Sequence, residues 1–76
     1  MNIIEIGKAI KYHRKISGLS RVECAQLAGI GKTAIYDIEH GKDTVQFKTL
    51  FKLLAILNIR IELQSPLMKK YANEKS

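Results

Sequence analysis

The side chains of this 76-residue chain that have functional chemistry are cationic and hydrogen-bonding groups. Its seven acidic residues are scattered along the sequence and form no pair suited to acid–base catalysis. The histidines His13 and His40 and the single cysteine, Cys24, lack the paired spacing of a metal site. A nucleotide-binding loop requires a glycine-rich turn directly after a strand, and no glycine-rich turn follows a predicted strand here. The sequence therefore predicts no enzyme, no cofactor and no metal.

Charge and composition favour an anionic partner in a reducing compartment. Thirteen basic residues against seven acidic ones give a net charge of +6, which favours nucleic acid first, although many small basic proteins bind none. A single cysteine forms no internal disulfide, and Cys24 fits a buried thiol better than a reactive one. With no apolar run of about 18 residues and no signal-peptide pattern, the expectation is a soluble, cytoplasmic protein with no membrane contact.

Residues 20–41, with the sequence SRVECAQLAGIGKTAIYDIEHG, form the stretch around which the rest of the chain is organised, and they include the cationic residues Arg21 and Lys32. Ser20 is a good N-cap, and Glu23 three residues later completes a capping box, so a helix is expected from Arg21. Gly29 suits a helix end that needs positive φ. Helical spacing then resumes over Lys32–His40. The stretch therefore predicts two short helices joined by a tight turn.

A small residue, Ala25, stands where two helices crossing at a short turn would approach most closely. Together with the cap and the glycines, it predicts a helix-turn-helix motif with Lys32–His40 as the recognition helix. The alternative is an ordinary helical hairpin with no nucleic-acid role.

Two further helices complete a single small domain. The first is expected from Ile3 to Ser17, with Asn2 as its N-cap. Its inner face is expected to carry Ile3, Ile6, Ile10 and His13. The last is expected from about Gln46 to Leu57 and to end at Asn58 in a left-handed conformation. Its inner stripe is expected to be Phe47, Leu50, Leu53 or Leu54, and Leu57.

The segment Ile59–Gln64 alternates apolar and polar residues, which predicts a half-buried strand. A lone strand leaves its backbone groups unpaired, so the expected partner is the same strand of a second copy, through Ile59, Ile61 and Leu63. The alternative is an extended tail packed on the preceding helix. The fold expected is thus mainly α, with one C-terminal β-strand that pairs in a homodimer. The domain spans residues 1–66 and a mobile tail spans 67–76, with a short helical turn possible around Leu67–Tyr71.

The whole layout resembles a known family. The matching motifs are Ile6-Gly7, Ile10, Arg14-Lys15, Gly18-Leu19-Ser20, Ala25, Ala28-Gly29-Ile30, Ile35, Ile38-Glu39 and Gly41. On these residues the chain resembles the Cro/cI-repressor (XRE) family of helix-turn-helix regulators over Ile6–Leu57. Four helices followed by a short strand resemble, more closely, the HipB-type antitoxins.

This resemblance implies a set of DNA-contacting residues. The implied base contacts, at the start of the recognition helix, are Lys32, Thr33, Tyr36 and Asp37. Each has suitable chemistry, although Asp37 accepts from cytosine in one interpretation and only balances charge in the other. The implied phosphate contacts are Ser20, Arg21, His40 and Lys42. For His40, a solvated helix-end residue is an equal alternative.

The resemblance also implies a structural ion pair between Arg14 and Glu39, which would lock the first helix onto the recognition helix. The sequence departs from the family at two positions. Arg21 stands where the family often has glutamine, and Gly31 stands where it often has a serine or threonine cap.

The function implied is that of a repressor of its own operon. It would bind an inverted-repeat operator as a homodimer and neutralise a HipA-family serine/threonine kinase toxin. One alternative is a stand-alone or phage-type repressor without a toxin. A second is a protein-interaction module that has lost DNA binding, against which the basic balance, Lys32 and Arg21 argue.

Overall fold

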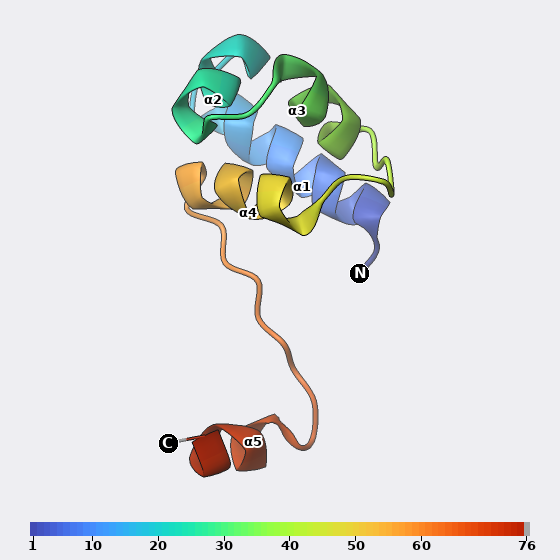
Figure 1. Ribbon diagram of the computed structural model, residues 1–76, viewed down its shortest axis with the longest axis vertical. Coiled ribbons are helices and arrows are strands. Elements are labelled where there is room, and N and C mark those ends of the chain that lie inside the picture. The colour runs from blue at the N-terminus through green and yellow to red at the C-terminus, as the bar shows by residue number, and fades with distance from the viewer. Residues whose placement is uncertain (76) are drawn as a thin grey trace.

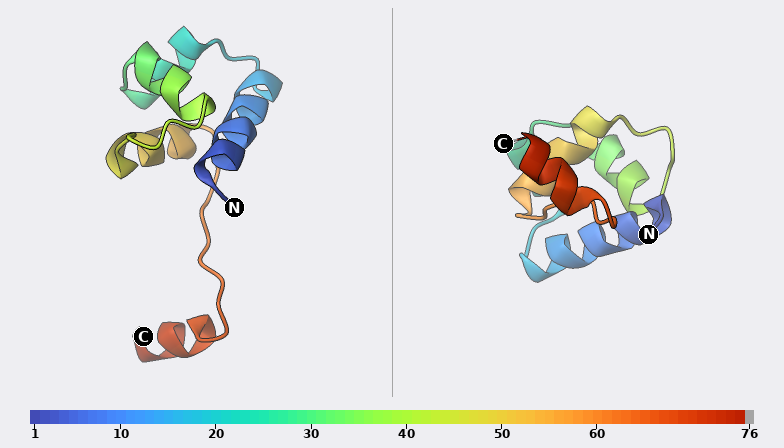
Figure 2. Two further views of the ribbon diagram at one scale, coloured as in Figure 1. Left: turned by 90° about the vertical axis from the view of Figure 1, so that its right-hand side faces the viewer. Right: turned by 90° about the horizontal axis from the view of Figure 1, so that it is seen from below.

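In the computed structural model, which describes residues 1–75, the described chain forms five α-helices (Figure 1). They are α1 (Ile3–Ile16), α2 (Arg21–Ala28), α3 (Lys32–Glu39), α4 (Phe47–Ile56) and α5 (Met68–Lys75). The first four pack together, with α1 against α3 and α2 against both α3 and α4. An extended segment leads away from this body to α5 (Figures 1 and 2). The expected bundle of four helices is confirmed, and its boundaries differ from the predicted ones by at most one residue.

Local signals set the ends of the first two helices. The Asn2 side chain accepts a hydrogen bond from the Glu5 backbone N–H at 2.9 Å, which caps α1. Ser20 and Glu23 form the predicted capping box of α2, at 3.1 and 3.0 Å. Gly29 ends α2 in the left-handed region, with φ of 70°. These short-range contacts were readable from the sequence because both partners lie within one turn.

The core lies between the first four helices. Its buried apolar side chains are Ile10, Cys24, Ala25, Ile35, Ile38, Leu50, Leu53, Leu54 and Leu57. Cys24 is completely buried, and burial raises the pKa of its thiol above the ordinary value. The thiol therefore stays protonated at neutral pH and packs as a small apolar group.

The predicted inner face of α1 is wrong at His13. His13 is exposed, and its Nδ1 donates to the Ala9 carbonyl at 2.6 Å. The buried residues of α1 are instead Gly7, Ile10 and Arg14. Gly7 makes this possible, since a Cβ there would overlap the Ile38 carbonyl oxygen and lie 3.0 Å from that of Glu39. The close approach of the α1 and α3 backbones turns that face of α1 inward.

The predicted inner stripe of α4 is wrong at Phe47, which is 75% exposed. Leu50, Leu53 and Leu54 are buried as expected. Phe47 is the first residue of α4 and stacks with Phe51, one turn later, at a ring-centroid distance of 6.0 Å. The two rings lie on the side of the helix that faces away from the core.

The expected strand over Ile59–Gln64 is not formed: in the described residues of this single chain no strand is present. Asn58 has the predicted left-handed φ, 57°, and the Ile59 N–H donates to the Leu54 carbonyl at 2.9 Å. Beyond it the chain is irregular and mostly exposed. A strand needs a neighbouring strand to accept and donate its backbone hydrogen bonds, and among residues 1–75 no backbone bonds to residues 60–64.

The C-terminal residues are more regular than predicted. Where the sequence favoured at most a turn around Leu67–Tyr71, the helix α5 extends from Met68 to Lys75. Both Leu67 and Tyr71 are largely exposed. The mobility of this tail stays a prediction. Within residues 1–75, no helix has the length and apolar character needed to cross a membrane.

Candidate nucleic-acid interface

The turn between α2 and α3 fixes the angle at which α3 leaves the body. After the left-handed Gly29, the Ile30 N–H donates back to the Ala25 carbonyl at 3.0 Å. Ala25 is 5% exposed, so the small residue expected at the helix crossing is buried there. Gly31 then precedes α3 without a side-chain cap. The first two residues of α3, Lys32 and Thr33, are exposed, whereas Ile35 is buried.

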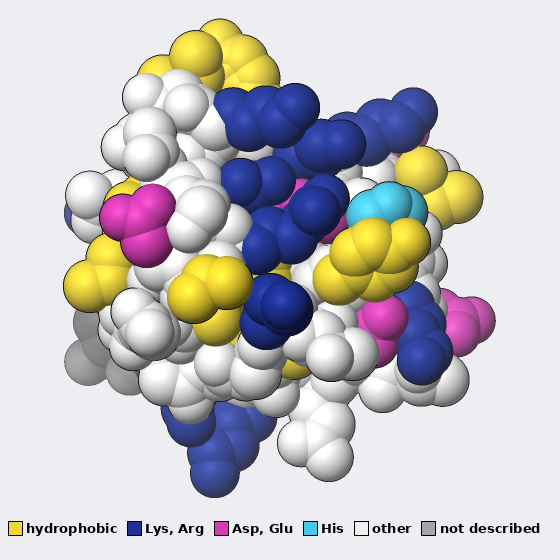
Figure 3. Space-filling view, turned by 90° about the horizontal axis from the view of Figure 1, so that it is seen from above, with side chains coloured by type: hydrophobic (Ala, Val, Ile, Leu, Met, Phe, Trp, Pro, Cys, Tyr) yellow, Lys and Arg dark blue, Asp and Glu magenta, His cyan; other side chains and the backbone are white. Residues whose placement is uncertain are grey.

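Four side chains meet at the start of α3. Arg21, Lys32, Thr33 and Tyr36 line one shallow hollow of about 430 Å³. Lys32, Thr33 and Tyr36 are exposed, and the Arg21 side chain is 32% exposed. In Figure 3, which views the molecule from the end at which α2 and α3 lie, Lys and Arg side chains run together across this face. The hollow therefore combines two cations, a hydroxyl and an aromatic ring on a basic surface.

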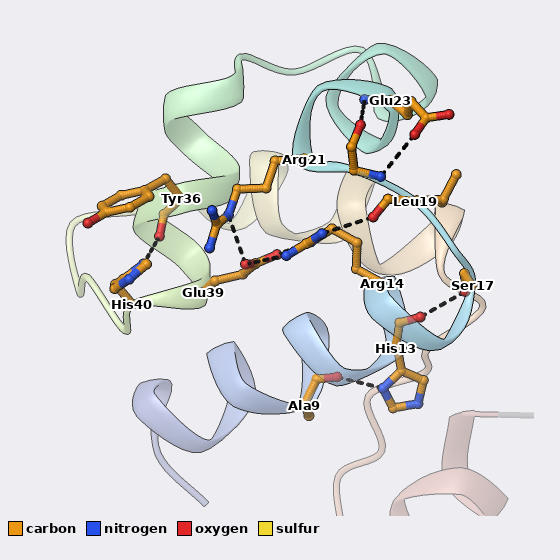
Figure 4. Close-up of polar contacts among 11 residues, drawn as sticks. Ala9, His13, Arg14, Ser17, Leu19, Arg21, Glu23, Tyr36, Glu39 and His40 are labelled. Atoms are coloured by element: carbon orange, nitrogen blue, oxygen red, sulfur yellow. Dashed lines mark hydrogen bonds and ion pairs between the residues drawn. The ribbon is translucent and has the colours of Figure 1, made fainter.

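His40 caps the other end of α3 and contacts Tyr36. Its imidazole stacks on the Tyr36 ring, with centroids 3.9 Å apart and planes 22° from parallel. Its Nδ1 donates to the Tyr36 carbonyl at 2.7 Å (Figure 4). The second ring nitrogen, Nε2, is thus the one left for a phosphate. The i, i+4 spacing of the two rings was a signal for this stack that the sequence reasoning did not use.

Asp37 and Lys42, both implied as DNA contacts, lie next to each other. Their charged groups are 3.6 Å apart, and the Lys42 backbone N–H donates to the Asp37 carbonyl. This geometry favours the interpretation in which Asp37 balances charge over the one in which it accepts from cytosine.

Arg14 and Glu39, the residues that the resemblance pairs, are in contact across α1 and α3. Arg14 Nε donates to Glu39 Oε2 at 2.6 Å, and Nη2 donates to Oε1 at 3.1 Å. Its Nη1 donates to the Leu19 carbonyl at 2.9 Å. Figure 4 shows these contacts, and both residues are buried.

A contact that sequence reasoning missed joins Arg21 to the same carboxylate. Arg21 Nε donates to Glu39 Oε1 at 3.1 Å, and the guanidinium carbon lies 5.4 Å from the centre of the Tyr36 ring. Burial by itself raises the pKa of Glu39, but hydrogen bonds and charge from Arg14, and then from Arg21, outweigh it and lower that pKa below its ordinary value. Glu39 is thus an ionised anchor for two arginines. Eighteen residues separate Arg21 from Glu39, so no local spacing indicated the contact.

The residues expected to mediate dimerisation lie away from this face. Ile59 is half-buried against the core, whereas Ile61 and Leu63 are 51% and 75% exposed. An apolar groove of about 170 Å³ lies between α1, Leu54 of α4 and residues 59–62. No group of three or more metal-ligating side chains occurs among residues 1–75.

Known proteins resemble this chain in sequence and in fold. Residues 10–64 match a helix-turn-helix family model. An HTH-type transcriptional regulator of Sinorhizobium fredii, y4mF, is 34% identical over 62 residues, which are 82% of each chain. Its own role is uncharacterised.

Solved structures share the fold. A chain from a HipA-HipB-O2-O3 complex superposes with a TM-score of 0.79 at 26% identity, over 87% of this chain and 93% of its own. The restriction-modification controller protein C.AhdI of Aeromonas hydrophila gives 0.68 at 26% identity, over 76% of this chain and 88% of its own. The fold, the exposed start of α3 and the family match all indicate a helix-turn-helix regulator. The chain belongs to the Cro/cI (XRE) helix-turn-helix family of DNA-binding, non-enzymatic transcriptional regulators.

Proposed function

We propose that this protein is a cytoplasmic repressor that binds an inverted-repeat operator and reads it with the first turns of α3. The observation that carries this proposal is the hollow shared by Arg21, Lys32, Thr33 and Tyr36. Lys32 suits the O6 and N7 acceptors of guanine, and Thr33 suits a base edge or a thymine methyl group. Tyr36 offers a ring and a hydroxyl to the next base pair. Asp37 is proposed to act mainly through charge.

Residues that contact the phosphate backbone of DNA are proposed to lie at and beside this hollow. Ser20 and Arg21 stand at the N-terminus of α2, where the helix dipole and the cation both favour a phosphate. Lys42 and His40 stand beyond the other end of α3. Phosphate contacts on both sides of α3 would fix its register in the major groove.

A homodimer is proposed to present two copies of α3 to the operator. Two features of the chain support it. Within the described residues, the backbone of residues 60–64 makes no hydrogen bond, and Ile61 and Leu63 are exposed, with Ile61 lining an apolar groove. Pairing of this segment with its copy would supply the missing ladder and bury these side chains. The two recognition helices would then contact half-sites about 34 Å apart.

An antitoxin role is proposed in addition. HipB, the protein of similar fold, is found in a complex with HipA, and this chain has a surface that DNA binding leaves open. The free surface comprises the outer face of α1, α4 and the exposed α5. A HipA-family kinase bound there could remain on the operator-bound dimer and add its own contacts. The competing proposal, a stand-alone regulator, has support from the similarity to C.AhdI.

Operator binding is tested by selecting bound duplexes from a random library and then measuring affinity by fluorescence anisotropy. Lys32→Ala and Thr33→Ala should each weaken the selected duplex by about 1–3 kcal/mol and leave a scrambled duplex nearly unaffected. Lys42→Ala should weaken both duplexes equally and lower the salt slope by about 0.9. Lys69→Ala on α5 is the matched control. Unchanged affinity in the first three variants would contradict the proposal.

The toxin role is tested by co-expression with the products of the neighbouring genes. Capture of a kinase by the full chain supports the antitoxin proposal. A chain truncated after Pro66 should keep its fold and operator binding, and its capture of the kinase reports whether the tail takes part. If the full chain captures no neighbour, the stand-alone regulator is the better proposal.

A further inference from the structure

The buried carboxylate of Glu39 connects the recognition face to the core. Its side chain is fully inaccessible, and Arg14 holds it from α1 with two hydrogen bonds. Its Oε1 also accepts from Arg21 Nε. Because the carboxylate is already fixed by Arg14, the bond from Arg21 anchors that guanidinium in one place instead of leaving it to sample rotamers.

The anchored guanidinium lies beside the ring of Tyr36. The separation of 5.4 Å from the ring centre is within the range of a cation–π contact. On the same helix, His40 stacks on that ring and is itself tied to the Tyr36 carbonyl. Tyr36 is 50% exposed, yet it is held by both neighbours (Figure 4). A side chain so constrained is pre-organised before any ligand binds.

Arg21 retains donors for a second contact. The described hydrogen bond uses Nε, and the two terminal nitrogens donate to no group in residues 1–75. A phosphate bound by those nitrogens would share the guanidinium with the Tyr36 ring and Glu39. The position of the DNA backbone and the orientation of a base-reading side chain would then be coupled through one group.

We propose that Arg21 is a positioning residue for sequence readout: anchored on Glu39, it holds the Tyr36 ring in the orientation in which the hydroxyl meets a base edge. This inference rests on the proposed operator binding. It adds that Arg21 sets specificity, whereas a simple phosphate contact would raise the affinity for every duplex alike.

Arg21→Lys separates the two roles. Lysine keeps the positive charge for a phosphate but lacks the planar fork that binds Glu39 through Nε while lying beside an aromatic ring. The full-length chain is titrated with the library-selected duplex and with a scrambled duplex of the same composition. The ratio of the two affinities is the specificity ratio.

Arg21→Lys should lower the specificity ratio about 5- to 50-fold and leave the salt slope unchanged. Tyr36→Ala should lower the ratio similarly, and the double variant should lower it no further than Tyr36→Ala alone, because Arg21 acts through Tyr36. Lys69→Arg on α5, the reverse substitution outside the proposed DNA and dimer contacts, should change nothing. The inference would be overturned if Arg21→Lys kept the specificity ratio of the unmodified chain. It would also be overturned if the double variant lowered that ratio by the sum, in free energy, of the two single losses.

Two further results keep the test decisive. If the unmodified chain selects no sequence from the library, operator binding itself fails, and the inference falls with it. The unbound protein also provides a direct readout by NMR, with Tyr12 and Tyr71 as internal references. Arg21→Lys should shift the ring resonances of Tyr36 and leave the other two in place, and unchanged Tyr36 resonances would overturn the proposed positioning.

Discussion

Arg14 of α1 donates two hydrogen bonds to Glu39 of α3, and both residues are buried between the helices, 7% and 6% exposed. The pair fastens the first helix to the recognition helix. Arg21 extends it to the surface through the same carboxylate. A charged network that spans the core and ends at the proposed DNA face links the stability of the domain to the geometry of its binding site.

Glu39→Gln should destabilise the protein by about 3 kcal/mol, because it leaves the buried Arg14 guanidinium without a counter-ion. The double variant Arg14→Met/Glu39→Leu should cost less than Glu39→Gln alone, since it removes both buried charges and fills their space with apolar atoms. Urea denaturation at one fixed protein concentration measures both. A double variant less stable than Glu39→Gln would show that the network contributes more than its charges cost to bury.

Acid should remove the contribution of Glu39 to stability. The folded-state pKa of Glu39 lies below the ordinary value of 4.5, so its contribution is complete above pH 4.5 and is lost as the pH falls through the folded-state pKa. The urea midpoint of the unmodified chain should therefore fall below about pH 4.5. In Glu39→Gln this fall should be smaller.

The comparison variant for this experiment is Glu23→Gln. The pKa of Glu23 is also lowered, chiefly by the Ser20 backbone N–H and then by the Ser20 side chain, but the carboxylate is exposed. Glu23→Gln should retain most of the acid-dependent loss. If the acid-dependent fall of the urea midpoint were reduced equally in both variants, the assignment of that fall to Glu39 would be contradicted.

Gly7→Ala should destabilise the fold by about 1–3 kcal/mol, because its methyl group would overlap the Ile38 carbonyl. The direction of the stability change distinguishes the two cases, since alanine is favoured over glycine by about 1 kcal/mol in a helix that is free of such a contact. Gly31→Ser is the control, because open space surrounds Gly31 and serine is a good N-cap. Thermal unfolding checks both, and a stabilised Gly7→Ala would mean that α1 and α3 lie further apart.

Ile61→Asn should weaken the proposed homodimer, and Glu62→Asn, on the neighbouring residue, should weaken it less. The reason is the alternation of the segment, in which Ile61 belongs to the apolar series and Glu62 to the polar one. Sedimentation equilibrium over a series of protein concentrations measures the dimer dissociation constant. An unmodified chain that stays monomeric at micromolar concentration would show that residues 59–64 do not pair.

Asp37→Asn should raise the affinity for the selected and the scrambled duplex together, by about fivefold. The substitution removes a negative charge from the binding face and releases Lys42 from its partner at 3.6 Å. Anisotropy titrations at two salt concentrations check this. A loss of affinity confined to the selected duplex would instead indicate that Asp37 accepts a hydrogen bond from a base.

The sequence by itself determined the features whose partners lie within about one helical turn. The Asn2 cap, the Ser20–Glu23 box and the left-handed Gly29 fix helix ends through contacts three or four residues apart, so residue types and spacing were enough to predict them. Most buried leucines and isoleucines followed from helical periodicity for the same reason. The resemblance to the helix-turn-helix family implied an outward-facing start of α3, and Lys32 and Thr33 are indeed exposed.

Only the tertiary structure decided the contacts between segments distant in sequence. It turned His13 outward, because Gly7 lets α1 approach the Ile38 carbonyl so closely that another side of the helix faces the core. It brought Arg21 onto Glu39, a bond whose geometry depends on the angle between α2 and α3. It also left residues 59–64 without a strand, although their alternation predicts one. Periodicity indicates which side chains avoid water, whereas a β-strand forms only where another strand lies within hydrogen-bonding distance. Among residues 1–75 of a single chain, no strand lies beside that segment.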